Sequence, residues 1–305
     1  MSVGRWAAGI PIENPGVASE FVLRLINGIL YPGVRVLHRA TLDGLERLPE
    51  SGPFLLVTNH SGGLGIAEIN AFASLYANRF GRTRPLAGFA HPASFHLWPL
   101  TFLFREIGAI PSTYAAAERA LDLGVPILLF PGGDHEAMRP IWQANRVDFA
   151  GRVGFLRIAR KAKVPIVPMG IRGGHMTAPM LLRSPFFAYL FVWPRLVGLK
   201  RYALSLLAVL GVALILTTVP LAWPWRCLLA WAWAGSPLAL APWVPWRLRL
   251  RIGEPIPAES LFDFALEAGA EGGARTAFDP ELARAGVTVE AAVQRLVSHR
   301  SPEGD

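Results

Sequence analysis

Cysteine is almost absent from this chain of 305 residues, in which Cys227 stands alone. A single cysteine excludes a disulfide framework and a cysteine-based metal site. Residues 1–14 hold one early arginine but no continuous apolar core, so they do not predict a secretory signal. Charged residues make up 17% of the chain and apolar residues 52%. That balance is unusually apolar for a soluble protein of this length.

Acidic residues are missing from a long central stretch. There is none between Asp148 and Glu254, whereas 14 lysines and arginines fall in the same interval. A segment of one charge sign that is also rich in leucine and tryptophan favours an anionic membrane surface as its partner. Nucleic acid is not expected, because these basic residues lie between long apolar runs and not on polar elements. An arginine-rich genome would raise the basic count, but it does not account for the missing acids.

Several familiar chemistries lack their sequence patterns. A glycine pattern opens at Gly63 and Gly65, but Glu68 stands where a dinucleotide site needs its third glycine, and no suitable acid follows. Ser61 has no G-x-S-x-G elbow around it, which argues against a serine hydrolase. No histidine has the spacing of a metal ligand, so no metal is expected and each of these is interpreted as structural or surface-exposed: His91, His96, His135 and His175.

Strand-like and helix-like segments alternate along the first two thirds of the chain. Strands are expected at 54–58, 85–89, 125–130, 164–169 and 247–252, and helices at 18–38, 66–80, 92–104, 114–123 and 153–163. Pro32 is expected to break the first helix, which fits either a membrane-surface helix or ordinary core packing. The alternation predicts an α/β fold with a mixed, largely parallel sheet flanked by helices.

The segment 180–246 departs from that alternation. Residues 203–222 and 227–246 are two uncharged runs separated by Arg226, and prolines interrupt the second. Six of the ten tryptophans fall between Trp223 and Trp246, which favours a position at a membrane interface. Basic residues flank both ends, so both are expected on the cytoplasmic side. An apolar membrane-associated helical hairpin is therefore predicted before the last strand, shallow in preference to spanning.

Two expected strands end in similar turns. The strand 54–58 is followed by Asn59, His60, Ser61, Gly62 and Gly63, and the strand 125–130 by Pro131, Gly132, Gly133, Asp134, His135 and Glu136. A histidine at a strand end suits proton transfer, because its ordinary pKa is near neutrality. Glycine allows another backbone or a ligand to come close. This pattern indicates a catalytic site at the ends of two strands.

These turns, with 108–112 and 164–168, resemble in order the four motifs of the lysophospholipid acyltransferase (PlsC-like) family. The Pro-Gly-Gly turn with its Glu136-Ala137 pair is closest to the branch that includes neutral-lipid and phytyl-ester acyltransferases. The resemblance implies transfer of an acyl chain from a thioester to a lipid hydroxyl. It also implies acyl-CoA or an acylated acyl carrier protein as co-substrate, a lipid acceptor, and no bound cofactor or metal.

In that family the first-motif histidine is the general base, which maps onto His60. The family's aspartate five residues later is Gly65 here, and the arginine of the second motif is Tyr114. Glu68 lies where it could orient the imidazole, and an exposed helix acid fits it equally well. Backbone N–H groups of the glycine turns are expected to stabilise the oxyanion. The substrate-binding candidates are Asn59, Ser61, Gly62, Gly63, Pro131, Gly132, Gly133, Asp134, Glu136 and Arg139.

A neutral acceptor is expected, because Asp134 places negative charge where a phosphate would lie. Arg139, Arg146 and Arg152 follow the same turn, and their charges would instead suit a lysophosphatidate-type acyltransferase with altered motifs. Since the motif aspartate and arginine are replaced, a catalytically degenerate lipid-binding membrane protein is a further alternative, as is a hydrolase or thioesterase.

The expected organisation has three parts. Residues 1–40 form an N-terminal amphipathic, membrane-proximal helix, 41–257 the acyltransferase domain with 180–246 inserted, and 258–305 a C-terminal helical tail. The protein is expected to bind an anionic membrane surface, with its catalytic domain on the cytoplasmic side.

Overall fold

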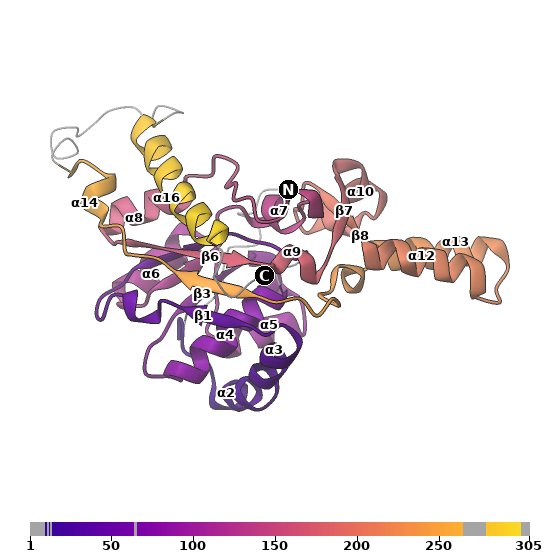
Figure 1. Cartoon of the computed structure of the whole chain (residues 1–305), viewed down its shortest axis with the longest axis horizontal. Helices are drawn as coiled ribbons and strands as arrows, with labels where there is room; N and C mark the ends of the chain where they lie inside the picture. The colour runs from indigo at the N-terminus through magenta and orange to yellow at the C-terminus, as the bar shows by residue number, and fades with distance from the viewer. Residues whose placement is uncertain (1–9, 11, 13, 64–65, 265–278, 300–305) are drawn as a thin grey trace.

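The structure, a computed structural model, describes residues 10, 12, 14–63, 66–264 and 279–299 (Figure 1). In this part of the chain the main sheet has seven strands in the order β1-β9-β6-β2-β5-β3-β4. Only the β6–β9 pair is antiparallel, so the predicted mixed, largely parallel sheet is confirmed. The strands are β1 Thr41–Asp43, β2 Leu55–Thr58, β3 Ala87–Ala90, β4 Ile110–Pro111, β5 Ile127–Leu129, β6 Ile166–Arg172 and β9 Arg249–Ile252.

Helices cover both faces of this sheet. They are α2 Glu20–Leu25, η1 Ile26–Leu30, α3 Tyr31–Leu37, η2 Leu45–Arg47, α4 Ile66–Phe80, η3 Pro92–His96, α5 Leu100–Glu106, α6 Tyr114–Asp122, α7 Gly133–Ala137, η4 Ile141–Gln143, α8 Gly154–Ala162, α9 Gly174–Thr177, α14 Ala258–Leu261 and α16 Pro280–Ser298. One core holds buried side chains of α6, α8 and α16, and a second those of α3 and α4. In Figure 1 α16 and α8 lie above the sheet and α2, α3 and α4 below it.

The C-terminal helix α16 is part of the main core. Its apolar side chains at Ala285, Val289, Val293 and Val297 repeat every four residues and are buried against β6. Asp279 caps the helix by accepting hydrogen bonds from the N–H groups of Glu281 and Leu282. The described part of the segment 258–305 therefore packs on the sheet.

Two prolines act differently from the sequence prediction. Pro32 does not break the first helix, because it is the second residue of α3 and follows the π-helical turn η1. The helix runs on from α2 through η1, where the Tyr31 N–H donates to the Ile26 carbonyl, and this wider turn accommodates a residue without an N–H. The single helix expected over 92–104 is instead two pieces, η3 and α5, with Pro99 at the N-cap of the second.

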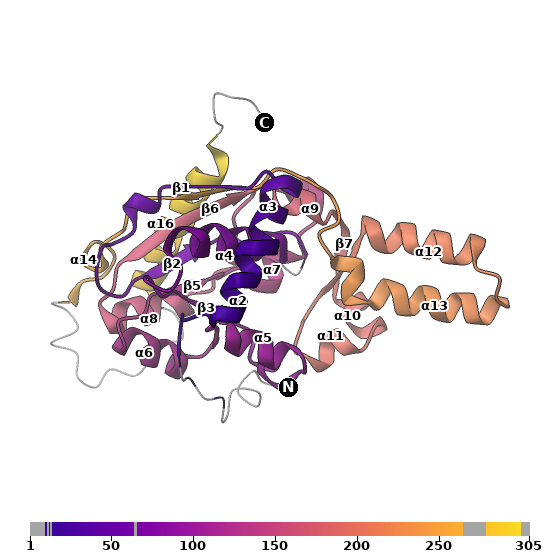
Figure 2. The ribbon, with the colours of Figure 1, turned by 90° about the horizontal axis from the view of Figure 1, so that it is seen from below.

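The excursion between β6 and β9 contains elements that the sequence did not reveal. These are β7 Met180–Ser184, α10 Pro185–Leu190, α11 Trp193–Leu196 and β8 Tyr202–Ser205, with β7 and β8 paired antiparallel. The helices α12 Leu206–Thr218 and α13 Trp223–Gly235 follow, and then η5 Pro237–Leu240. Figures 1 and 2 show α12 and α13 as a hairpin that projects from the body. Across the described residues, no helix combines the length and hydrophobicity needed to cross a membrane.

The contact between α16 and β6 gives a stability prediction. A methyl group on Gly170 would come within 2.6 Å of Leu296 Cβ and 2.7 Å of Val297 N, so Gly170→Ala forces the helix away from the sheet. We expect the free energy of unfolding to fall by about 1–3 kcal/mol, the usual cost of overpacking. Gly286→Ala is the matched control, because its methyl would meet only Leu156 Cδ1, at 3.6 Å. Urea unfolding checks both, and equal midpoints for the two variants would contradict the close approach.

Candidate active site

Three neighbouring strands deliver their ends to one edge of the sheet. β2 lies between β5 and β6 and is parallel to both, so His60, the turn before α7 and the start of α9 follow the same edge. Asn59 extends the pairing beyond β2, since its side chain donates to the Ile171 carbonyl at 2.9 Å and accepts from the Ile171 N–H at 2.7 Å. The side-chain amide of Asn59 is thus engaged within the sheet, at a place where α/β proteins commonly bind ligands.

The His60 ring is held by Glu68, which the first turn of α4 supplies. Nδ1 of His60 contacts Oε1 of Glu68, and the same oxygen accepts the Ser61 N–H at 2.9 Å. The second oxygen of Glu68 accepts a hydrogen bond from the Ser61 hydroxyl. The Glu68 side chain has no exposure, whereas the His60 side chain keeps 14%. Glu68 is therefore a buried partner of the histidine, and the face of α4 that carries it points inward.

Glycines make this close packing possible. A methyl group on Gly174 would fall 2.0 Å from Ser61 Oγ and 2.9 Å from Glu68 Oε2. Gly62 and Gly63 both have positive φ, and a methyl on Gly63 would strike Met180 Cε and the Leu240 carbonyl. Only glycine fits such positions without strain. The loop after His60 is thus enclosed by α9, β7 and η5.

Glu136, on α7, holds the backbone of the same loop. One carboxylate oxygen accepts the His60 N–H at 3.0 Å, and the other accepts the Asp148 N–H at 2.8 Å. Burial raises the pKa of Glu136 to about 7, although these two N–H donors and the charge of Arg139 act in the opposite direction. Glu136 is 1% exposed, so both oxygens serve the protein and neither faces open solvent.

Two further polar side chains next to Glu136, those of Arg139 and His175, are also buried. Arg139 is 1% exposed, donates to the Arg146 carbonyl, and lies 3.5 Å from Asp148 Oδ2, which also contacts His135 Nε2 at 3.0 Å. His175 is buried as well, and it hydrogen-bonds the Glu136 carbonyl. Burial, followed by the charge of Arg139, lowers the pKa of His175 to about 4. His175 is therefore neutral at physiological pH.

The Pro-Gly-Gly turn is clamped by an arginine. Arg152 donates to the carbonyls of Pro131 at 3.2 Å and Gly132 at 2.8 Å, and to Asp134 Oδ1 at 2.7 Å. The charge of Asp134 is therefore paired within the protein, which weakens the argument that it repels a phosphate. Two of the three arginines that would serve a phosphate, Arg139 and Arg152, are likewise engaged internally.

Two positions that depart from the family motifs, Gly65 and Tyr114, are not part of the described histidine site. Gly65, at the family's aspartate position, is outside the described residues. Tyr114 is exposed at the start of α6, at the end of β4. The sequence reasoning missed Gly174 and Asp148. A signal for Gly174 was present, because Gly173-Gly174 is a third glycine pair directly after a strand, like Gly62-Gly63 and Gly132-Gly133.

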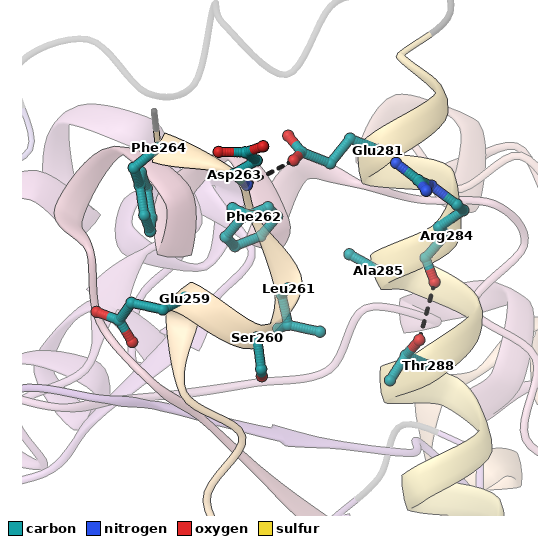
Figure 3. A pocket seen from close by; sticks show the side chains of 10 residues that line it. All are labelled: Glu259, Ser260, Leu261, Phe262, Asp263, Phe264, Glu281, Arg284, Ala285 and Thr288. Atoms are coloured by element: carbon teal, nitrogen blue, oxygen red, sulfur yellow. Dashed lines mark hydrogen bonds between the residues drawn. The ribbon is translucent and has the colours of Figure 1, made fainter. Parts of the chain in front are cut away.

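A polar pocket between α14 and α16 lies at the other edge of the sheet (Figure 3). Ile256, just before α14, bridges to Ile166 at the beginning of β6, whereas His60 follows the end of β2. In Figure 3 Glu281 of α16 faces Asp263, whose N–H it accepts at 2.8 Å. This pocket is separate from the histidine site. The described residues contain no group of three or more His, Cys, Asp or Glu side chains that could hold a metal ion.

Residues 39–172, which carry β1 to β6 and all of the residues that hold His60 except those of the excursion, match the sequence profile of the family described as Acyltransferase. The predicted resemblance to this family, and to its neutral-lipid branch, is confirmed.

Curated relatives are similar to this chain over about half of its length. An uncharacterized protein of Mycobacterium tuberculosis is 28% identical over 60% of this chain and 51% of the relative. The DGAT1/2-independent enzyme synthesizing storage lipids of Bos taurus is 31% identical over 44% of this chain and 39% of the relative. Phytyl ester synthase 2, chloroplastic, of Arabidopsis thaliana is 29% identical over 46% of this chain and 20% of the relative. The chain thus spans about half, or less, of the length of these relatives.

Among solved structures, the 1-acyl-sn-glycerophosphate acyltransferase PlsC of Thermotoga maritima is similar to this chain. The TM-score is 0.48 at 16% identity, over 92% of this chain and 82% of that one.

The lowered pKa of His175 gives a pH prediction. The unfolded histidine binds a proton below its ordinary pKa of 6.5, whereas the folded one binds it only near pH 4, so stability falls as pH drops through this window. His175→Asn removes this dependence, so the difference in unfolding free energy between wild type and variant should grow from pH 4 to 6.5, by on the order of 2–3 kcal/mol. Glu136 acts in the opposite sense but is common to both proteins. Parallel stability curves from urea titrations would refute the assignment.

Proposed function

We propose that this protein transfers an acyl chain from a thioester to the hydroxyl of a lipid, with His60 as general base. The observation that carries the proposal is the contact of His60 Nδ1 with the buried carboxylate of Glu68 at the end of β2. An imidazole whose Nδ1–H donates to a carboxylate presents an unprotonated Nε2. That nitrogen accepts the proton of the acceptor hydroxyl as its oxygen attacks the thioester carbonyl.

Glu68 takes the role of the aspartate that the family motif places five residues after the histidine. It fixes the tautomer and the orientation of the ring, and the Ser61 N–H and hydroxyl fix Glu68 in turn. The ring of Phe130, with its centroid 4.6 Å from that of His60, supports the imidazole from the side. Glu68 and Phe130 are positioning residues, whereas the side chain of His60 touches the reacting atoms.

The tetrahedral oxyanion needs N–H donors that the fold has not already used. The Gly63 N–H donates to the Ala137 carbonyl at 2.8 Å and that of Gly133 to the Phe130 carbonyl at 3.1 Å. We therefore assign the oxyanion to the N–H groups of Gly62 or Gly132. Both lie in glycine turns at the same sheet edge as His60.

The donor is acyl-CoA or an acylated acyl carrier protein, and the chemistry requires no resident cofactor. The acylated lipid product stays in the membrane, whereas the released CoA or acyl carrier protein is soluble. We therefore propose that the enzyme works at a membrane surface with its catalytic domain on the cytoplasmic side. The basic residues that flank the hairpin support this orientation.

The acceptor is a neutral hydroxyl such as that of diacylglycerol, a long-chain alcohol or a glycolipid. Phosphate recognition needs arginines with free donors. Arg139 is buried on Asp148 and the Arg146 carbonyl, and Arg152 is engaged by the Pro-Gly-Gly turn. The family's motif-two arginine is Tyr114. The names of the storage-lipid and phytyl-ester relatives point to acceptors of the same class.

His60→Ala tests the general base. With labelled acyl-CoA and mixed lipids, wild type should form an acylated lipid, and the alanine variant should lose about 10²–10⁴-fold in rate, because a positioned base contributes that much. Glu68→Gln should lower kcat while changing KM for the acceptor little, because it orients the ring without touching substrate. Free fatty acid as the wild-type product would instead indicate a hydrolase, and no product from either donor would leave a lipid-binding protein.

A panel of acceptors tests the substrate class. At equal concentration in mixed micelles, diacylglycerol or long-chain alcohols should be acylated faster than lysophosphatidate or glycerol phosphate. The reason is that Arg139 is 1% exposed and paired with Asp148, whereas Arg152 is bound to the Pro-Gly-Gly turn and to Asp134. A clear preference for either phosphate-bearing acceptor over every neutral alcohol would overturn this assignment while leaving the role of His60 intact.

A further inference from the structure

The α12–α13 hairpin touches the rest of the protein only at its root, which is the start of α12 after β8 and the end of α13 before η5. The two helices pack on each other along their length, and the root contacts η5, β8 and the end of α10, where Trp231 donates to the Leu190 carbonyl. The helices come close at Gly211, where a methyl group would meet the indole nitrogen of Trp233 at 1.9 Å. In Figure 2 both helices extend away from α10 and α11 into open space. Within the described chain, the far half of the hairpin therefore has no covering partner.

The uncovered surface is apolar on every side. The exposed side chains of the hairpin include Val209, Leu210, Leu214, Leu221, Trp223, Trp225, Leu228, Leu229 and Trp231. Exposed apolar patches of this kind mark a surface that binds a membrane or a protein. Tryptophan at the tip and along the shaft favours the membrane interface, where an indole keeps one polar end wet.

The single charged residue of the hairpin is placed to tolerate an apolar environment. Arg226 Nε donates to the Leu221 carbonyl at 2.6 Å, and Nη1 donates to the Leu216 carbonyl at 3.2 Å. Carbonyls at the end of α12 have no helical partner, so the guanidinium satisfies groups that would otherwise be costly in hydrocarbon. Its remaining donors can reach headgroups, as arginines at membrane interfaces do.

Positive charge surrounds the root. Lys200 and Arg201 are exposed just before β8, Arg195 is exposed on α11, and no acidic residue occurs from 149 to 253. Burial, and then repulsion by Arg201 and Arg139, lowers the pKa of Arg183 on β7. The root thus carries a positive field that complements anionic headgroups.

The root also forms the wall of the catalytic loop. The Leu240 carbonyl of η5 and Met180 of β7 enclose Gly63, and the Val244 N–H donates to the Thr177 carbonyl at 3.0 Å. Thr177 in turn lies against Gly62. A surface that seats the hairpin root therefore also fixes the position of His60 relative to that surface.

We propose that the α12–α13 hairpin docks this protein on an anionic bilayer, with its apolar shaft lying obliquely in one leaflet so that Trp223, Trp225 and Arg226 stay near the interface, and with its basic root on the headgroups. Each helix has 13 residues and rises about 20 Å, whereas a hydrocarbon core is about 30 Å thick. The hairpin thus reaches into the layer that holds lipid acceptors. The proposal concerns binding, so it can fail while the acyl-transfer proposal holds, and the reverse.

Flotation with lipid vesicles tests it in the absence of substrates. Wild type should float with vesicles of phosphatidylcholine and phosphatidylglycerol in equal amounts, and more weakly with phosphatidylcholine alone. Replacing residues 213–229 by Gly-Ser-Asn-Gly keeps the Gly211–Trp233 contact and the root, and should abolish flotation. The double variant Lys200→Gln, Arg201→Gln should weaken binding to the anionic vesicles about fivefold per residue, which corresponds to ~1 kcal/mol for each basic group.

Two control variants replace exposed apolar residues elsewhere. Val287→Ser on α16 should float like wild type, and so should the double variant Phe21→Ser, Ile29→Ser on the N-terminal helices, whose side chains are also exposed. Retained flotation of the shortened hairpin would overturn the proposal, as would loss only in the Phe21, Ile29 variant. If wild type is dimeric without lipid and the shortened variant is monomeric, a second copy covers the hairpin and the proposal is wrong.

A second measurement reports depth and does not depend on a deletion. Lipids brominated on their acyl chains should quench tryptophan fluorescence, and replacing Trp223 and Trp225 together by Leu should remove much of that quenching. Absence of quenching in wild type would show that the shaft stays outside the bilayer, which contradicts the proposal.

Discussion

The carboxylate of Glu68 has no access to water, and that constraint shapes the site around it. A buried carboxylate is stable only when donors surround it. Here the donors are the His60 ring, the Ser61 N–H and the Ser61 hydroxyl. These contacts tie the first turn of α4 back to the end of β2. Gly174 must remain a glycine, because any side chain would displace Ser61.

A second buried carboxylate completes the arrangement. Glu68 holds the ring of His60, and Glu136, which follows the neighbouring parallel strand β5, accepts its backbone N–H. The histidine is thus fixed at two points by acids from two motifs that lie far apart in the sequence. Both carboxylate oxygens of Glu136, a predicted substrate-binding residue, accept N–H groups of the protein. Preorganisation of this kind is what a proton-transfer group requires.

Local patterns in the sequence predicted the central strands β2, β5 and β6 and their ends, because apolar runs followed by glycine pairs have few other interpretations, whereas the short strands β1 and β4 were not predicted. Glu68 could be proposed as the partner of His60 from the sequence, because a helix was expected to begin at residue 66, just before Glu68. Other features depend on tertiary contacts that no local pattern encodes. The burial of His175 beside Glu136 and the packing of α16 on β6 both join segments distant in sequence. The sequence did not predict the β7–β8 pair, because these two short strands lie among apolar helical segments.

The excursion that carries the hairpin leaves and rejoins the sheet at one place, since Arg172 at the end of β6 and Arg249 at the start of β9 are register partners. The sheet therefore closes in the same way whatever the length of chain between them, and the entropy of closing a loop grows only slowly with its length. The ends of the excursion enclose Gly62 and Gly63, while its middle is remote from the sheet. Such a division of labour lets the projecting part lengthen, shorten or change composition independently of the chemistry, as an exchangeable module would.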